Sequence, residues 1–233
     1  MKRAVKRASM AAACAALLSP LASCDAPTMP GHGLSDVYDF RLLTEPRLVL
    51  RWPTGTTVRV YVAGGSGERA SLLEAATDEG ARVWNEEALY GEYLLVRTGD
   101  ITEADAVIRW SDDLPPVDTE ACQPLIVRAV TTFCLTDPDP ARARLQVFPL
   151  LPPHQAAQSN VRMLVTILGT QSLQPERVHR LVAHELGHVL GIGQHSLDAR
   201  DLMYGGEPGR ADPSQRDAAT MRVMYHTRPH LTP

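Results

Sequence analysis

The sequence has 233 residues, of which 44% are hydrophobic and 21% are charged, a balance that predicts a packed domain and excludes a fibrous or wholly disordered chain. Its formal net charge is −4, and becomes −8 without the signal peptide considered next; a chain this acidic argues against a nucleic-acid-binding function, because proteins of that class neutralise phosphates with an excess of Lys and Arg. We therefore expect no nucleic-acid partner.

The N-terminus has the layout of an export signal peptide. Four basic residues precede a run of small apolar residues at 11–18, which is too short to span a bilayer. The tetrapeptide LASC at 21–24 resembles the lipobox of bacterial lipoproteins, in which cleavage before the cysteine is coupled to its acylation. We expect residues 1–23 to be removed and a lipid on Cys24 to anchor the protein to a membrane of the bacterial cell envelope; a secreted protein without a lipid is the alternative. Removal would change the net charge from −4 to −8, since the segment holds four basic residues and no acidic one.

The rest of the chain divides into a spacer, a domain and a tail. Residues 24–46 contain several Pro and Gly residues and little periodicity, which predicts a flexible spacer. Residues 47–228 form the predicted domain, and residues 229–233 a short tail. Runs rich in β-branched and aromatic residues predict strands at 58–62, 93–96, 106–110, 126–133, 145–148 and 162–168.

Apolar residues at helical spacing predict three helices. The first covers 68–89, with Gly80 as an interior weak point. The second starts near Pro175, runs to about Leu190 and ends at Gly191, because proline suits the first helical position and glycine the residue after the last. The third covers 214–225, with Ser214 as its cap. Strands that precede helices, rather than strict alternation, indicate an α+β domain.

Two cysteines remain after Cys14 leaves with the signal and Cys24 takes a lipid. Cys122 and Cys134 form an even pair in a compartment that permits disulfides, so we predict a bridge between them. Its short loop would contribute about 3 kcal/mol through the unfolded state. Two buried thiols are the alternative.

The segment HELGH at 184–188 carries the candidate chemistry. Residues four apart on a helix share a face, so His184 and His188 can reach one ion, with Glu185 beside them. His195 follows after the helix has ended. Three neutral imidazoles leave the fourth tetrahedral position of Zn²⁺ open to water, as in catalytic rather than structural zinc sites. We predict a zinc site at these three histidines, with Glu185 as the catalytic base.

These residues carry a family resemblance. The segment HELGHVLGIGQHS at 184–196 resembles the extended zinc motif of the metzincins, and the stretch from there through LMY at 202–204 resembles that of the matrixins. Met203 follows His195 by eight residues, the separation of the matrixin pattern. Weaker likenesses are EADAVI at 103–108 and PSQRD at 213–217, so the resemblance covers about 47–228.

The resemblance implies a zincin-like α+β fold and the activity of a zinc metalloendopeptidase. The fold would have a twisted, mostly parallel sheet with one antiparallel edge strand, two long helices and a small C-terminal helical subdomain. The enzyme would hydrolyse proteins or peptides outside the cytoplasm, with zinc-bound water as nucleophile and Glu185 as general base. Met203 would form a packing floor beneath the metal, and Tyr204 would shape the cleft or bind the oxyanion. We expect a monomer.

One departure from the family pattern concerns the third ligand. The usual spacing places the third histidine three residues after the glycine, where this chain has Gln194. Either the loop at 192–194 bulges by one residue, which Gly193 would tolerate, or the third ligand is lost. The match downstream keeps register with His195. The alternative is a catalytically inactive zincin-fold lipoprotein that acts as a binding module, with zinc retained structurally or lost because of this register change, although a structural site has no need of Glu185.

A second metal site, for an ion such as Ca²⁺, would have to draw on His154 with Asp137 or Asp139. An acidic, proline-rich loop is usually only a loop.

Overall fold

The computed structural model describes residues 36–44, 46–63, 66–111, 122–126, 129–136, 142–146, 148, 160–169 and 174–233, with the backbone alone described for 122–126. All of them belong to one unit, residues 32–233. The predicted signal peptide, Cys24 and the residues of the second metal site considered above, His154, Asp137 and Asp139, lie outside the described residues. Within the described part of the chain, no helix is long and apolar enough to cross a membrane.

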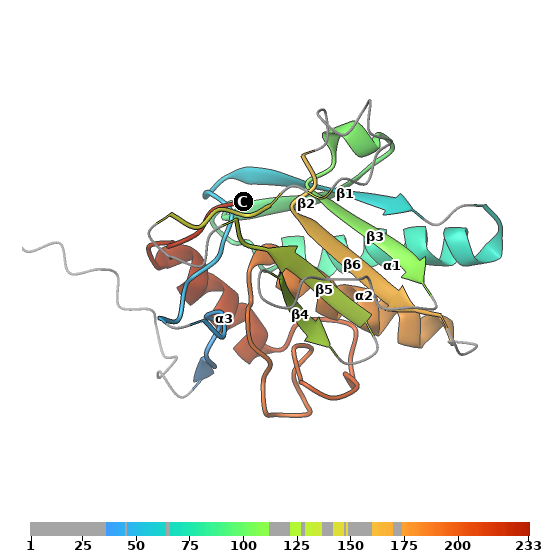
Figure 1. Cartoon of the computed structure of the whole chain (residues 1–233). Helices are drawn as coiled ribbons and strands as arrows, with labels where there is room; N and C mark the ends of the chain where they lie inside the picture. The colour runs from blue at the N-terminus through green and yellow to red at the C-terminus, as the bar shows by residue number, and fades with distance from the viewer. Residues whose placement is uncertain are drawn as a thin grey trace, which may run out of the picture. The chain divides into compact units, whose positions relative to one another are not determined.

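The core of the domain is a six-stranded sheet in the order β2-β1-β3-β6-β5-β4 (Figure 1). β1 pairs in parallel with β2 and β3, and β3 pairs in parallel with β6, whereas β5 runs antiparallel to both β6 and β4. The strands are β1 (Thr56–Ala63), β2 (Tyr93–Thr98), β3 (Ala106–Ser111), β4 (Cys122–Ile126), β5 (Ala129–Cys134) and β6 (Met163–Leu168).

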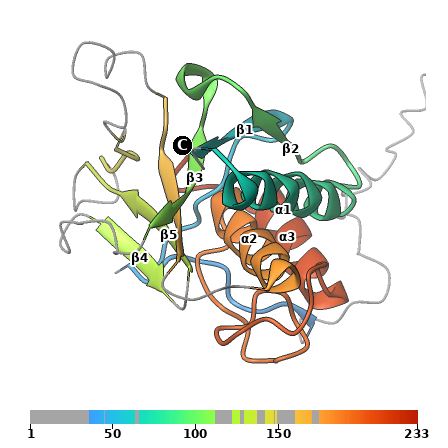
Figure 2. The same cartoon turned by 90° about the vertical axis from the view of Figure 1, so that its right-hand side faces the viewer.

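Three α-helices complete the domain: α1 (Glu68–Asn85), α2 (Pro175–Leu190) and α3 (Gln215–His226). Figures 1 and 2 show α1 and α2 on the same face of the sheet. α1 contacts β1 and β2, α2 contacts β5 and β6, and the two helices pack against each other. The predicted α+β class, with a mostly parallel sheet and two long helices, is confirmed.

The bounds of α2 and the cap of α3 are as predicted. α2 has Pro175 at its start and Gly191 at its end, and the Ser214 hydroxyl accepts a hydrogen bond from the backbone N–H of Asp217 at the start of α3. Both features are local, because proline, glycine and capping side chains act within one turn of the helix end.

Three predictions on the strands are wrong. The single strand predicted at 126–133 is two strands, β4 and β5, because the residues between them include no Gly, Pro, Asn or Asp to indicate a turn. The antiparallel strand is therefore not the edge of the sheet, since β4 pairs outside it. In the region predicted as a strand at 145–148, the described residues 145, 146 and 148 form no named strand, and Leu145 makes an isolated bridge with Leu135.

The β4–β5 pair bears on the predicted disulfide. Its antiparallel register places Cys122 directly opposite Cys134, and Cys134 is disulfide-bonded. The identity of its partner stays a prediction.

Part of the predicted spacer packs into the domain. Leu42 is 1% exposed and belongs to the main hydrophobic cluster. The backbone N–H of Tyr38 donates to the Thr220 hydroxyl and its side-chain hydroxyl donates to Asp217, both on α3. This segment packs on the domain without forming a helix or a strand. Its sequence therefore has no periodic pattern from which its packing could be predicted.

At Gly80, α1 packs closely against α2. A Cβ atom there would lie 3.2 Å from the Ala183 Cα and 2.9 Å from the Leu186 Cδ1. One turn further along α1, the Trp84 indole N–H donates to the Ala183 carbonyl at 2.7 Å. The glycine that weakens α1 as an isolated helix therefore allows the helices to meet closely.

Gly80→Leu is expected to lower the free energy of unfolding by about 1–3 kcal/mol, because the larger side chain must push α1 away from α2. Ala75→Leu is the control, since Ala75 is exposed on the same helix. Urea unfolding of both variants measures the difference. Equal stabilities of the two variants would contradict the close contact.

Candidate metal centre

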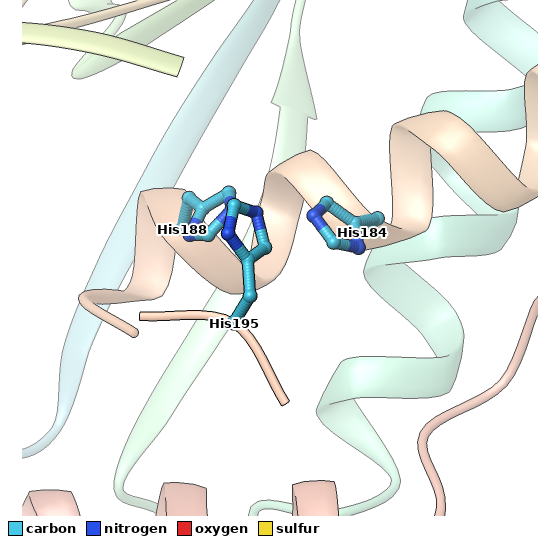
Figure 3. A group of neighbouring side chains, drawn as sticks. All are labelled: His184, His188 and His195. Carbon is cyan, nitrogen blue, oxygen red and sulfur yellow. The ribbon is translucent and has the colours of Figure 1, made fainter. Parts of the chain in front are cut away.

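Three histidines from two segments converge on one point (Figure 3). His184 and His188 project from α2, and His195 projects from the loop that follows it. One ring nitrogen of each lies within 4.8 Å of the others, and the Nε2 atoms of His188 and His195 are 3.2 Å apart. Among the residues that the structure describes, no other group of His, Cys, Asp and Glu side chains converges in this way. The structure thus brings together the three ligands predicted from the sequence.

Backbone carbonyls orient two of the rings. The Nδ1 of His184 lies 2.7 Å from the Leu202 carbonyl oxygen, and the Nδ1 of His188 lies 2.5 Å from that of Ile192. A carbonyl oxygen only accepts hydrogen bonds, so each Nδ1 must carry the proton and donate it. The Nε2 of each ring then presents a lone pair, as metal-binding histidines do when a second group holds the other nitrogen.

Burial keeps the imidazoles in the neutral form that binds metals. Desolvation lowers the pKa of His184 to about 4, and it also lowers the pKa values of His188 and His195. Tetrahedral Zn²⁺ with Zn–N bonds of about 2.0–2.1 Å separates its ligand nitrogens by roughly 3.3 Å. Three neutral imidazoles, two of them with nitrogens at nearly that separation, are a donor set that fits zinc.

Glu185 lies beside this cluster and is 3% exposed. Its Oε2 accepts a hydrogen bond of 2.6 Å from the hydroxyl of Thr131 on β5. Burial raises the pKa of Glu185 to about 8, against the opposing effect of the Thr131 hydrogen bond. A dication held by the neighbouring histidines would lower this pKa again. Thr131 was not predicted, because no sequence motif indicates which strand residue will face α2.

The extra residue before the third histidine is absorbed in the loop after α2. The amide Nε2 of Gln194 donates to the carbonyl of Arg41 at 3.0 Å, while His195 reaches the cluster. The side chain of Gln194 therefore binds the backbone of Arg41, and His195 is the histidine after Gly191 that joins His184 and His188.

Met203 packs against α2, the helix that carries His184 and His188, at Gly187. It is 0% exposed, and a Cβ atom on Gly187 would collide with its Sδ and lie 2.8 Å from the Trp84 Cζ2. Ser196, next to His195, donates its backbone N–H to the Met203 carbonyl at 2.7 Å. The side chain of Met203 therefore packs against α2 at Gly187, and its backbone carbonyl binds Ser196, the residue after the third histidine.

Tyr204 is half-buried, and its ring lies against Gly206. Its predicted role in the cleft or at the oxyanion stays a prediction.

A second residue missed in the sequence, Asp217, holds the turn at Leu202 and Met203, called the methionine turn below. Its buried carboxylate accepts hydrogen bonds from the backbone N–H groups of Leu202 at 2.8 Å and Met203 at 3.3 Å. It also accepts from the Ser214 N–H and the Tyr38 hydroxyl, both at 2.8 Å. The Ser-x-x-Asp spacing indicates a helix cap, but not that the same carboxylate binds the turn.

Comparisons with known proteins add little. No family model matches the chain, and no curated protein matches it. Two solved structures of myroilysin align at 13% sequence identity, with TM-scores of 0.41 and 0.42. The alignments cover 82% and 76% of this chain, and 100% and 83% of those chains. With likeness this low, fold and function rest on the geometry above.

His195→Ala is expected to weaken zinc binding by more than about 100-fold, since loss of an outer hydrogen-bond partner alone costs about 10–100-fold. His179→Ala is the matched control, because His179 lies on α2 outside the cluster. Chelator competition and elemental analysis measure zinc affinity and content. Full zinc content at unchanged affinity in His195→Ala would refute the assignment.

Glu185→Gln is expected to change how stability depends on pH in chelator-treated protein. The carboxyl has a pKa of about 8 when folded, against an ordinary value of 4.5. Between these values the folded protein holds a proton that the unfolded chain releases, so wild-type stability is lost as the pH rises. The variant does not titrate there and should gain about 3–5 kcal/mol relative to wild type between about pH 4.5 and 8. Urea unfolding across this range measures the effect, and parallel profiles would contradict a buried neutral carboxyl.

Proposed function

We propose that this protein is a zinc-dependent endopeptidase that hydrolyses peptide bonds in proteins or peptides. The observation that carries the proposal is the buried Glu185, held by Thr131 beside three convergent histidines. A structural zinc site needs ligands only. A buried carboxylate costs free energy, so its place next to three neutral ligands supports a chemical role.

Each side chain has a separate task in this proposal. The three imidazoles would hold zinc, which would supply Lewis-acid chemistry at the scissile peptide bond. Glu185 accepts a proton from the attacking water and passes it to the leaving amine. Thr131 holds one carboxylate oxygen and leaves the other free for the proton. Met203 keeps α2 in place from below, and Tyr204 shapes the cleft or binds the oxyanion.

The alternative of an inactive binding module takes two forms, in which zinc is lost or is kept as a structural ion. The position of His195 with the other two histidines argues against loss of the metal, and the buried Glu185 argues against a purely structural site.

The proposal places the enzyme outside the cytoplasm, anchored through a lipid on Cys24. The basic and apolar N-terminal sequence supports export. The disulfide-bonded state of Cys134 supports it independently, because disulfides persist in oxidising compartments and are rare in the cytosol.

Glu185→Gln should retain stoichiometric zinc and lose about 10²–10⁴-fold in kcat on a generic protein substrate, because the amide cannot accept the proton. Glu176→Gln, exposed in the first turn of the same helix, is the control and should keep full activity. Fluorogenic casein or a peptide library digest measures cleavage. Equal activity of Glu185→Gln and wild type would refute the proposed function.

A further inference from the structure

The loop after α2 is tied to the N-terminal strap, defined here as residues 38–42. The backbone N–H of Gly193 donates to the carbonyl of Phe40 at 2.7 Å. The side-chain amide of Gln194 donates to the next carbonyl, that of Arg41, at 3.0 Å. Two consecutive loop residues therefore bind two consecutive strap carbonyls.

The strap is itself fixed at both ends. Tyr38 is bound to α3, where its hydroxyl donates to Asp217 at 2.8 Å and its backbone N–H donates to Thr220 at 3.3 Å. Leu42 lies in the hydrophobic core, and its N–H donates to the Leu48 carbonyl at 2.8 Å. A loop bound to this strap is bound to the body of the domain.

The loop and strap also touch closely. A Cβ atom on Gly193 would lie 2.7 Å from the Leu42 Cδ2, 3.0 Å from the Leu42 N and 3.1 Å from the Arg41 carbonyl carbon. There is no gap into which the loop could move toward the strap. The hydrogen bonds from Gly193 and Gln194 oppose movement of the loop away from the strap.

This loop contacts the metal centre at two histidines. The Ile192 carbonyl accepts the Nδ1 proton of His188, and Gln194 is joined directly to His195. On its other side, His195 is joined to Ser196, which is bound to the Met203 carbonyl. Both chain neighbours of His195 are therefore hydrogen-bonded: Gln194 to the strap and Ser196 to the methionine turn.

We propose that Gln194 is a positioning residue for the metal centre: it binds the N-terminal strap and thereby sets the place of His195. The residue that appears as an insertion in the zinc motif is then the one that makes the longer loop rigid. This inference rests on the proposed function in taking zinc as the ion. It goes beyond that function because it assigns the strap a role in positioning a metal ligand.

The test uses three substitutions of Gln194 in the full-length protein. Gln194→Met removes the donor at similar length and without charge, Gln194→Glu replaces the donor by an acceptor, and Gln194→Lys restores a donor. Zinc affinity is measured by chelator competition, and Co²⁺ absorption spectra report the geometry of the ligands. We expect Met and Glu to weaken zinc binding by about 3- to 10-fold, the effect of losing one hydrogen bond, and to alter the Co²⁺ spectrum. Lys should keep both near wild type.

The comparison of Glu with Lys separates positioning from charge. A carboxylate near the site attracts a dication and an ammonium repels it, so electrostatics alone would make Glu the tighter binder. The proposal predicts the opposite order. Gln146→Met, at an exposed position away from the loop, controls for loss of any surface glutamine.

Wild-type affinity and an unchanged Co²⁺ spectrum in Gln194→Met and Gln194→Glu would overturn the inference, as would tighter binding by Glu than by Lys. These measurements do not depend on peptidase activity. If wild type binds zinc with the predicted dependence on residue 194 but cleaves no substrate, the proposed function fails and the positioning role stands.

Discussion

The reversal of the chain at Gly191 is the constraint on which the convergence of the three histidines depends. This residue has φ = 119°, a left-handed conformation that residues with a side chain rarely adopt, and a Cβ atom there would collide with the Leu50 carbonyl. The N–H groups of Gly191 and Ile192 bind the carbonyls of His188 and Gly187, which closes a Schellman motif. Without this sharp end, the chain would continue along the axis of α2 and the third histidine would move away from the first two.

Side chains from other parts of the domain also bind the C-terminal end of α2. The indole N–H of Trp52 donates to the Val189 carbonyl at 2.8 Å, and the hydroxyl of Tyr225 donates to the Leu190 carbonyl at 3.2 Å. Together with the Schellman bonds, these contacts satisfy the last four carbonyls of α2, which would otherwise be buried without partners. A fully satisfied helix end costs little to bury, so the site can be placed in a protected interior.

Local signals in the sequence predict one half of the site and cannot predict the other. The positions of His184, Glu185 and His188 follow from helix geometry, and the bounds of α2 follow from Pro175 and Gly191. Thr131 and Asp217 act through contacts with residues 54 and 14–15 positions away, and no local pattern encodes such contacts. The split of β4 from β5 was missed for the opposite reason, because a β-rich run contains no residue that indicates a turn.

The strap shows why a domain boundary drawn from composition is unreliable at this site. Residues 38–42 lie in the stretch predicted as a spacer, yet Leu42 fills the core and the carbonyls of Phe40 and Arg41 bind the loop that precedes His195. A segment without secondary structure can be indispensable when its backbone carbonyls are the partners of a functional loop. The metal centre is therefore assembled from α2, the loop after it, the methionine turn, β5 and the strap. A chain that begins after the strap would keep all three histidines and lose one of the two ties that place the third.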